Sequence, residues 1–433
     1  MQESLDWSWV EAQIADTVNL WHSCSQRRPL PCPTYSRSDQ RNREQAYDRA
    51  LTEVEREARA KPVTPADRAA TRARTTACFA RFSAEALDLQ PDAIDLLTND
   101  FLPVGTSLAR WARSFDPDLS KEDIVQACRN AWTACGHQPL FGEPIQLTPS
   151  ILAYSLLYPY TDNYLDQPSI SADDKHQFSD RFRQRLRGNP IQAGNQHESA
   201  LWALVSLIED QYPRDLHPAV YDSLLAIHRA QEDSISQLDV CGSGPAAKLL
   251  QLSCAKGGTS VLADACLCRG HLTPQESHFA FHWGVLLQLG DDLQDIREDM
   301  RRGSATLFSR AAVLGIPLDR LADQLLSFSD CVASEMEALP SGAPMLRNLL
   351  RMSWRSLIVN AIADSHRFFT RAYLAEIEQS SPFRFKFLGA RRKRLTRRSG
   401  LYECLFNAFL EDQDAPEFAF PLPSRPAPAI CFD

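Results

Sequence analysis

The sequence predicts an all-α fold, and its composition leads to that class. Glycine is scarce, with 17 among 433 residues, where average usage of roughly 7% would give about 30. The alternation of apolar and polar residues that is typical of strands is rare, whereas good helix formers such as Ala, Leu, Arg, Gln and Glu are plentiful. Hydrophobic residues make up 44% of the chain, which is enough to bury a large core.

The first ninety residues predict a helical extension of unknown role. An amphipathic helix is expected around Trp7–Trp21, followed by a polar, proline-containing connection. Helical periodicity returns over about 45–60 and 65–89, and Pro91 with Asp92 opens the next helix. The chain therefore divides into an extension over 1–90, a main helical region over 91–380 and a C-terminal segment over 381–433.

The first part of the main region contains one helix with clear boundaries. A loop rich in Gly, Pro and Gln is expected over Gly136–Pro149. At its end, Thr148 has the form of an N-cap, with proline at the first helical position. The helix should end near Asp166, and Pro159 inside it predicts a kink.

The second part of the main region predicts a long helix. Its start, Thr273-Pro274-Gln275-Glu276, has the form of a capping box, and only single glycines interrupt the pattern until Gly303. A helix of about 28 residues at ~1.5 Å per residue would span roughly 42 Å. Further helices are expected over about 171–187, 197–211, 217–238, 244–269, 317–338 and 343–379.

The C-terminal segment begins basic, becomes acidic over Glu411–Glu417 and ends in a proline-rich tail that we expect to be disordered. Its basic part places six Lys or Arg residues within 391–398. A solvated basic helix end is one interpretation of this segment. Contact with a diphosphate and peripheral contact with an anionic membrane surface are the alternatives.

Charge and composition exclude several classes of function. The net charge of −9 argues against a general affinity for nucleic acid. The acidic N-terminus lacks the features of a signal peptide, and no apolar run approaches the roughly 18 residues of a membrane span. The twelve cysteines show no CxxC and no metal-ligand spacing. We therefore expect a cytoplasmic protein with reduced thiols.

Two clusters of aspartate are the most informative feature of the chain. Asp162 and Asp166 stand at i and i+4, and so do Asp291 and Asp295, with Asp292 beside them. Residues four apart share one helix face, where like charges repel, so such pairs rarely add stability. Oxygen ligands at this density suit Mg²⁺, which typically takes one or two carboxylates together with substrate phosphates. The clusters therefore predict a magnesium-dependent site for a diphosphate.

A diphosphate also needs cationic partners, and the sequence offers several. Lys256 is one candidate. Arg297, Arg301 and Arg302, just beyond the second cluster, are others, although they could equally complement a helix C-terminus. Two glycines, Gly257 and Gly258, follow the lysine, and each costs roughly 1 kcal/mol relative to alanine inside a helix. A local break that points backbone carbonyls into a cavity would justify that cost.

Other chemistries fit the sequence less well. A di-iron bundle would need ExxH motifs, and no glutamate here has a histidine three residues later. The chain also has no HExxH motif, no GxSxG motif, no Walker loop and no Rossmann fingerprint. The paired aspartate clusters therefore have no strong competing motif.

These clusters and their surroundings resemble the class I isoprenoid synthases. The segment 284–295, GVLLQLGDDLQD, is similar to the second aspartate-rich region of trans-prenyltransferases, in which a glutamine precedes DDxxD. Lys256 begins the stretch KGGTS, which falls where those enzymes carry a short Lys-containing motif on a broken helix. The first cluster, DNYLD, looks more like the DxxxD of squalene and phytoene synthases. It looks closer still to the DNxxD of bacterial large-terpene synthases of the tetraprenyl-β-curcumene synthase type. The NSE triad of terpene cyclases is not evident at the second site.

The resemblance covers about residues 90–380 and implies an antiparallel helical bundle around a deep apolar cavity. It also implies three Mg²⁺ ions at the cavity mouth. In this arrangement Lys256 would contact the diphosphate and Gln288 would lie near the reacting end of the allylic chain. The carboxylates would bind Mg²⁺ from two walls, one with Asp162 and Asp166 and the other with Asp291, Asp292 and Asp295.

The expected function is therefore that of a Mg²⁺-dependent enzyme that ionises an allylic polyprenyl diphosphate and directs the carbocation to a cyclised or eliminated terpene. Tyr158, one turn before Asp162, could limit the depth that the substrate chain reaches. A prenyltransferase that condenses prenyl diphosphates, head-to-tail or head-to-head, is the alternative within the same chemistry. A catalytically inactive isoprenoid-binding protein is the alternative of another class. The sequence leaves open whether the chain forms a homodimer.

Overall fold

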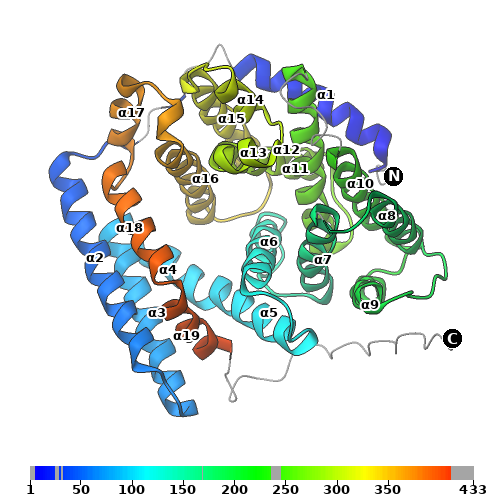
Figure 1. The fold of residues 1–433 in the computed structure, drawn as a ribbon, viewed down its shortest axis with the longest axis horizontal. Helices are drawn as coiled ribbons and strands as arrows, with labels where there is room; N and C mark the ends of the chain where they lie inside the picture. The colour runs from blue at the N-terminus through cyan, green and yellow to red at the C-terminus, as the bar shows by residue number, and fades with distance from the viewer. Residues whose placement is uncertain (1–4, 25–28, 31–32, 168, 236–244, 411–433) are drawn as a thin grey trace.

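The computed structural model describes residues 5–24, 29–30, 33–167, 169–235 and 245–410, and its regular secondary structure within these ranges is helical throughout (Figure 1). The predicted all-α class is confirmed. The α-helices are α1 (Trp7–Cys24), α2 (Arg37–Ala60), α3 (Pro65–Leu87), α4 (Pro91–Asp95), α5 (Leu102–Phe115), α6 (Lys121–Leu140), α7 (Pro149–Asp166), α8 (Ala172–Leu186), α9 (Gln196–Gln211), α10 (Pro218–Ile235), α11 (Ala246–Arg269), α12 (Pro274–Gln294), α13 (Ile296–Arg302), α14 (Leu307–Val313), α15 (Asp319–Glu337), α16 (Pro344–Asp364), α17 (Arg371–Ile377), α18 (Phe385–Arg397) and α19 (Ser399–Leu410).

Local sequence determines where several helices begin. Ser36, Thr64, Ser120 and Thr273 are N-caps whose hydroxyls accept a hydrogen bond from the backbone three residues later, while the acid at that position accepts one from the N-cap N–H. The capping box predicted at Thr273 is therefore confirmed. Thr148 caps α7 as predicted, since its side chain accepts a hydrogen bond from the backbone of that helix.

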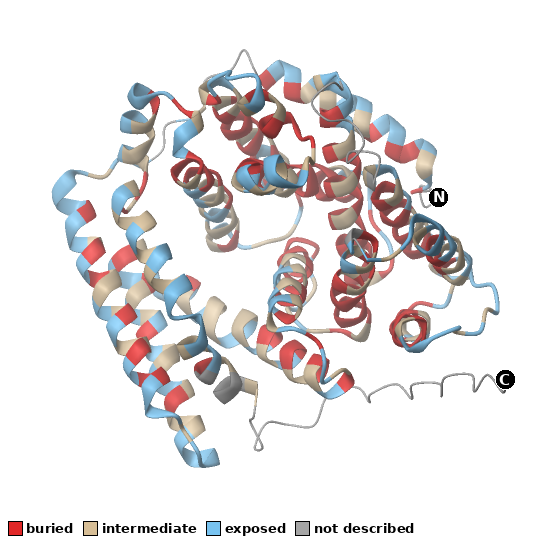
Figure 2. Ribbon diagram, viewed as in Figure 1, coloured by how far each residue is buried: buried red, intermediate tan, exposed pale blue. Residues whose placement is uncertain are grey.

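The main core is built around α11 and α12, which pack closely against each other. Helices α6, α7 and α10 pack against α11, helices α15 and α16 pack against α12, and α1 lies across α11 and α15 (Figure 1). Figure 2 shows that the buried positions are concentrated on these helices. Aromatic side chains bury roughly 150–250 Å² each, so the fully buried Trp111, Phe279, Phe281, Phe308 and Phe328 contribute much of this core.

A smaller group of packed helices, which we call the arm, consists of α2, α3, α18 and α19 (Figure 1). Its own core contains Ala46, Ala86 and Phe383, and the Tyr47 ring packs edge-on against Phe82 and Phe383 at 5.5 Å between centroids. The first ninety residues are thus divided between two environments. Helix α1 joins the main core, whereas α2 and α3 pack with the C-terminal helices.

Among the predicted boundaries that are wrong are the ends of α6 and α16. Helix α6 continues to Leu140 instead of giving way to a loop at Gly136. A Cβ on Gly136 would lie 3.1 Å from the Trp283 ring, so this glycine serves close helix packing and not a turn. Helix α16 ends at Asp364, where a short 3₁₀ turn and α17 replace the expected continuation. The predicted acidic stretch and proline-rich tail, residues 411–433, lie outside the described residues.

No helix within the described ranges combines the length and apolar character needed to cross a membrane.

Candidate functional site

The first aspartate cluster lies at the C-terminal end of α7. Asp162 is half-buried in the last turns of the helix, and Asp166 is its final residue. The side chain of Asp166 lies outside the part that the structure describes. Asn163, between the two, donates a hydrogen bond of 2.6 Å to the carboxylate of Asp123, in the first turn of α6. This bond holds the end of α7 against α6.

The second aspartate cluster lies where α12 ends and α13 begins. The single helix of about 28 residues predicted here is wrong, because Asp295 has φ −94° and ψ 10° and separates two helices. A hydrogen bond from outside the helix accompanies the interruption: the Ser365 hydroxyl donates to the Leu293 carbonyl at 3.0 Å. Backbone bonds still run from Asp295 to Asp291 at 2.8 Å and from Asp299 to Asp295 at 2.9 Å.

Glycines allow α11 and α12 to approach each other closely. A Cβ on Gly257 would lie 2.5 Å from the carbonyl oxygen of Gly284 and 2.4 Å from the Cβ of Gln288. A Cβ on Gly258 would lie 2.4 Å from the Phe281 ring. Helix α11 is continuous over both glycines, so the predicted local break is wrong. Close helix packing, and not a carbonyl-lined opening, accounts for the presence of glycine here.

Lys256 interacts with both aspartate clusters. Its Nζ lies 3.5 Å from Asp162 Oδ1, and its positive charge also favours the ionised forms of Asp291 and Asp292 on α12. Acidic residues that are far apart in the sequence therefore interact with one ammonium group. We call this region the mouth and define it by Asp162, Lys256, Asp291, Asp292, Asp295 and Asp299.

Asp292 is a deeply buried acid of the mouth, with 6% of its surface exposed. Its Oδ2 accepts a hydrogen bond from the Ser253 hydroxyl at 2.7 Å, and its Oδ1 accepts one from the Gln288 amide at 2.9 Å. Burial raises the pKa of Asp292, while these two hydrogen bonds oppose that change. Ser253 and Gln288 thus fix the orientation of this carboxyl.

Two further acids of the mouth also have raised pKa values. Desolvation by the surrounding protein raises the pKa of Asp291 to about 6, although the residue itself is exposed at the surface. Desolvation raises the pKa of Asp299 to about 7, and the charges of Asp292 and Asp295 add to the effect. Clustered acids that resist ionisation are typical of functional sites. A bound cation would favour their charged forms.

The donors of the mouth suit Mg²⁺ by type, since carboxylate oxygens are the ligands that this ion prefers. Among the described side chains, no three His, Cys, Asp or Glu residues already converge into a metal-binding group, and Asp166 is not among those described. Mg²⁺ usually retains several waters and takes phosphate oxygens. The raised pKa values of Asp291 and Asp299 show that the groups already nearby do not offset their desolvation, and therefore fit a cation that arrives with its own phosphate ligands.

The three arginines predicted to bind diphosphate have partners outside the acidic centre. Arg297 donates to the backbone carbonyl of Asp364 at 3.0 Å. Arg301 and Arg302 pair with Glu298 at 2.5 and 2.9 Å. These contacts agree with the interpretation that the arginines complement the end of a helix. A role for them in binding diphosphate stays a prediction.

Two residues of this region were not predicted from the sequence. Arg129, on the exposed side of α6, favours the ionised form of Asp291, and no local pattern marks it. Ser253 binds Asp292 from α11. Its position three residues before Lys256 is a signal that could have been used, because residues three apart share a helix face.

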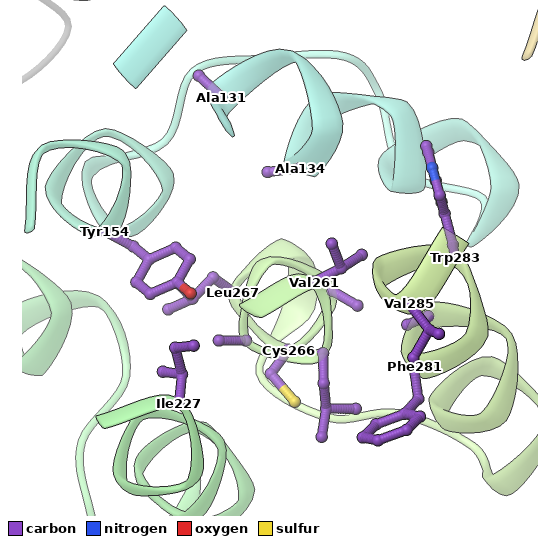
Figure 3. Close-up of a cluster of buried hydrophobic side chains, with 14 of the residues drawn as sticks. Ala131, Ala134, Tyr154, Ile227, Val261, Cys266, Leu267, Phe281, Trp283 and Val285 are labelled. Atoms are coloured by element: carbon purple, nitrogen blue, oxygen red, sulfur yellow. The ribbon is translucent and has the colours of Figure 1, made fainter. Parts of the chain in front are cut away.

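A small, mainly apolar hollow lies beside α7, along the turns of the helix that precede Asp162. Its volume is about 20 Å³, roughly the room that one water requires. Tyr154 and Tyr158 of α7 line it, together with Phe182 of α8 and with Ile227 and His228 of α10. Figure 3 shows Tyr154 and Ile227 approaching each other beside α11. The deep cavity implied by the resemblance is much larger and stays a prediction.

The basic segment 391–398 packs within the arm. Arg391 pairs with Asp48 at 2.5 Å, and Arg394 pairs with Glu55 at 2.7 Å. Arg398 also pairs with Glu55. Three of the six basic residues thus pair with acids of α2, and Arg392 pairs with Asp364 of α16. Contact of the segment with a diphosphate or a membrane surface stays a prediction.

Comparisons with family models, with curated proteins and with solved structures each found no match to this chain. The chemistry of the site is therefore interpreted from its own residues, above all from the acids that surround Lys256.

Proposed function

We propose that the chain is a Mg²⁺-dependent class I isoprenoid synthase that ionises an allylic polyprenyl diphosphate and converts the carbocation into a cyclised or eliminated terpene. The observation that carries the proposal is the position of Lys256. Its ammonium lies 3.5 Å from Asp162, and its charge acts on Asp291 and Asp292. One lysine among acids from two distant segments is an arrangement suited to a diphosphate that binds together with divalent cations.

Each group of the mouth has a role in this proposal. Asp162, Asp291 and Asp295 would hold Mg²⁺, which would neutralise charge on the departing diphosphate as a Lewis acid. Lys256 would exchange its present contact with Asp162 for a phosphate oxygen. Asp292 would help to hold the carboxylates of α12 in position, because its two oxygens already accept hydrogen bonds from Ser253 and Gln288.

The proposal is tested with purified protein and a series of allylic prenyl diphosphates of increasing chain length. Diphosphate release is measured with Mg²⁺ and with a chelator, and the organic products are identified by mass spectrometry. We expect release that requires Mg²⁺, with a hydrocarbon product of the same carbon number as the substrate. The Asp292→Asn variant should lose at least about 10²-fold of this activity.

Three other outcomes would contradict parts of the proposal. Products that grow longer only when isopentenyl diphosphate is added would indicate chain elongation, and a doubled linear hydrocarbon would indicate head-to-head coupling. Tight binding of every substrate without Mg²⁺-dependent release of diphosphate would rule out a synthase and favour an isoprenoid-binding protein.

A further inference from the structure

His228 of α10 lines the apolar hollow and is 2% exposed. Its Nε2 lies 3.0 Å from the backbone carbonyl oxygen of Ser179 on α8. Because a carbonyl oxygen only accepts hydrogen bonds, we assign the ring proton to Nε2. Burial lowers the pKa of His228 from its ordinary value, so the ring is neutral near pH 7. Its Nδ1 therefore carries an unshared electron pair.

This Nδ1 is buried and has no hydrogen-bond partner among the residues that the structure describes. Leaving a buried acceptor without a partner costs roughly 1–3 kcal/mol, and native proteins do so rarely. The hollow is lined mainly by apolar and aromatic side chains: the Phe182 ring stands edge-on at 5.1 Å from the imidazole centroid, and Tyr154 and Ile227 line the same hollow, together with the polar Thr161 and Gln231. A basic nitrogen in a mainly apolar hollow is suited to accept a proton from a hydrocarbon.

We propose that His228 is the general base that ends the reaction, by removing a proton from the last carbocation. This inference rests on the proposed function. A C–H bond next to the cationic carbon breaks, its electron pair forms the new C=C bond, and the proton binds His228 Nδ1. The product is a neutral alkene and the ring becomes an imidazolium. After the product leaves, the imidazolium returns its proton to solvent.

Charged groups near the ring suit this role. Glu232 Oε1 lies 3.8 Å from His228 Nε2, so its carboxylate would stabilise the imidazolium once it forms. Asp180 acts in the same direction, whereas Arg183, which pairs with Glu232, opposes it. The base therefore has a neutral resting state and nearby negative charge for its protonated state.

The hollow is also placed to receive the far part of a substrate chain. Thr161 and Tyr158 line it on α7, directly before Asp162, and Tyr154 lies roughly 12 Å further along the helix axis at ~1.5 Å per residue. A chain held at the mouth by its diphosphate would thus pass along this face toward α10. Because the hollow measures only about 20 Å³, roughly the room of one water, the side chains that line it would have to move apart to admit a substrate chain.

The decisive variant is His228→Gln, because glutamine can keep the hydrogen bond to the Ser179 carbonyl and has no base at the position of Nδ1. Diphosphate release and the product mixture are measured for the wild-type protein and the variant with the same substrate. We expect proton loss to the normal alkene to slow on the order of 10²-fold relative to diphosphate release. Water-trapped alcohols and other alkene isomers would replace that product.

His137→Asn is a matched control. His137 is also a fully buried histidine with one nitrogen lacking a partner among the described residues. Its Nδ1 lies 2.9 Å from the Thr133 carbonyl, a hydrogen bond that asparagine can reproduce. It packs against Phe279 and Trp283 on α12, outside the hollow. The product mixture of this variant should match that of the wild-type protein.

A second variant, Glu232→Gln, keeps the test decisive if His228→Gln does not fold. It removes the charge near Nε2 at a partly exposed position, and it should shift the products in the same direction by a smaller factor. An unchanged alkene share in His228→Gln, or in Glu232→Gln where only that variant folds, would overturn the role of His228. A wild-type protein that releases no diphosphate from any substrate would overturn the proposed function itself, which is a different result.

Discussion

The arm and the mouth both bring together charged residues that are distant in the sequence, but the result is opposite. In the arm, Glu55 is buried, and hydrogen bonds from Arg394 with the charge of Arg398 lower its pKa to about 2. In the mouth, desolvation raises the pKa of Asp291 to about 6 and that of Asp299 to about 7. The same class of side chain is therefore firmly ionised in one region and resists ionisation in the other.

The difference comes from the balance between desolvation and nearby cations: arginines outweigh the desolvation of Glu55, whereas desolvation outweighs the cations near Asp291 and Asp299. Each acid of α2 that faces α18 has at least one arginine opposite it. The negative charges of these acids are therefore neutralised by side chains of the same protein. In the mouth, several aspartates depend on Lys256 and Arg129. Paired charges of the first kind join helices, whereas acids that lack enough cations are suited to a cation from solution.

The largest expected effect separates the two regions by activity. Asp162→Asn removes a carboxylate that faces Lys256 and is expected to hold Mg²⁺, so turnover should fall by about 10³-fold. Asp48→Asn removes the carboxylate that pairs with Arg391 in the arm and should leave turnover within about twofold. Diphosphate release measures both. Equal losses in the two variants would show that the mouth has no special chemical role.

A second prediction compares glycine in the two regions. Gly257→Ala places a methyl group 2.5 Å from the carbonyl oxygen of Gly284, so α11 and α12 must separate. We expect a loss of about 1–3 kcal/mol in the free energy of unfolding. Gly389→Ala in α18 meets no atom within 4 Å and should stabilise that helix by about 0.5–1 kcal/mol. Urea unfolding followed by circular dichroism measures both variants.

If Gly257→Ala were as stable as the wild-type protein, the contact between α11 and α12 would have to be looser than described. In that case Gln288, which faces Gly257, would keep both its position and its hydrogen bond to Asp292.

The helical class and the two aspartate pairs could be predicted because they depend on local patterns. The spacing of Asp162 and Asp166, and that of Asp291 and Asp295, indicates carboxylates on shared helix faces whatever the rest of the chain does. Thr148 and Thr273 mark helix starts through hydrogen bonds that span only three residues.

The features that sequence reasoning missed depend on distant partners. The interruption at Asp295 accompanies a bond from Ser365, and the role of Gly257 depends on Gly284 in the next helix. The sequence alone does not show that Asp48 and Glu55 of α2 lie opposite the basic segment and pair with its arginines. No local pattern specifies which segments will meet, so these contacts required the folded structure.

A third prediction concerns the acids of the arm. Glu55→Gln leaves Arg394 and Arg398 facing a neutral side chain, and we expect a loss of about 2 kcal/mol of stability near pH 7. The pKa of Glu55 is lowered to about 2 in the folded protein. Its contribution is therefore complete above its ordinary pKa near 4.5 and is lost as the pH falls toward 2. Urea unfolding at several pH values should show the two proteins converging at the acid end.

The smallest expected effect has the opposite sign and belongs to the mouth. The pKa of Asp299 is raised to about 7 in the folded protein from 3.8, so folding favours its protonated form. That contribution is present below pH 3.8 and is lost as the pH rises through 7. Asp299→Asn mimics the protonated acid, so it should match the wild-type protein at low pH and exceed its stability at pH 8 by on the order of 1 kcal/mol, allowing for solvent screening. Urea unfolding without Mg²⁺ at both pH values measures the difference. A variant less stable than the wild-type protein at pH 8 would mean that the mouth already neutralises its acids as the arm does, and the contrast between the two regions would disappear.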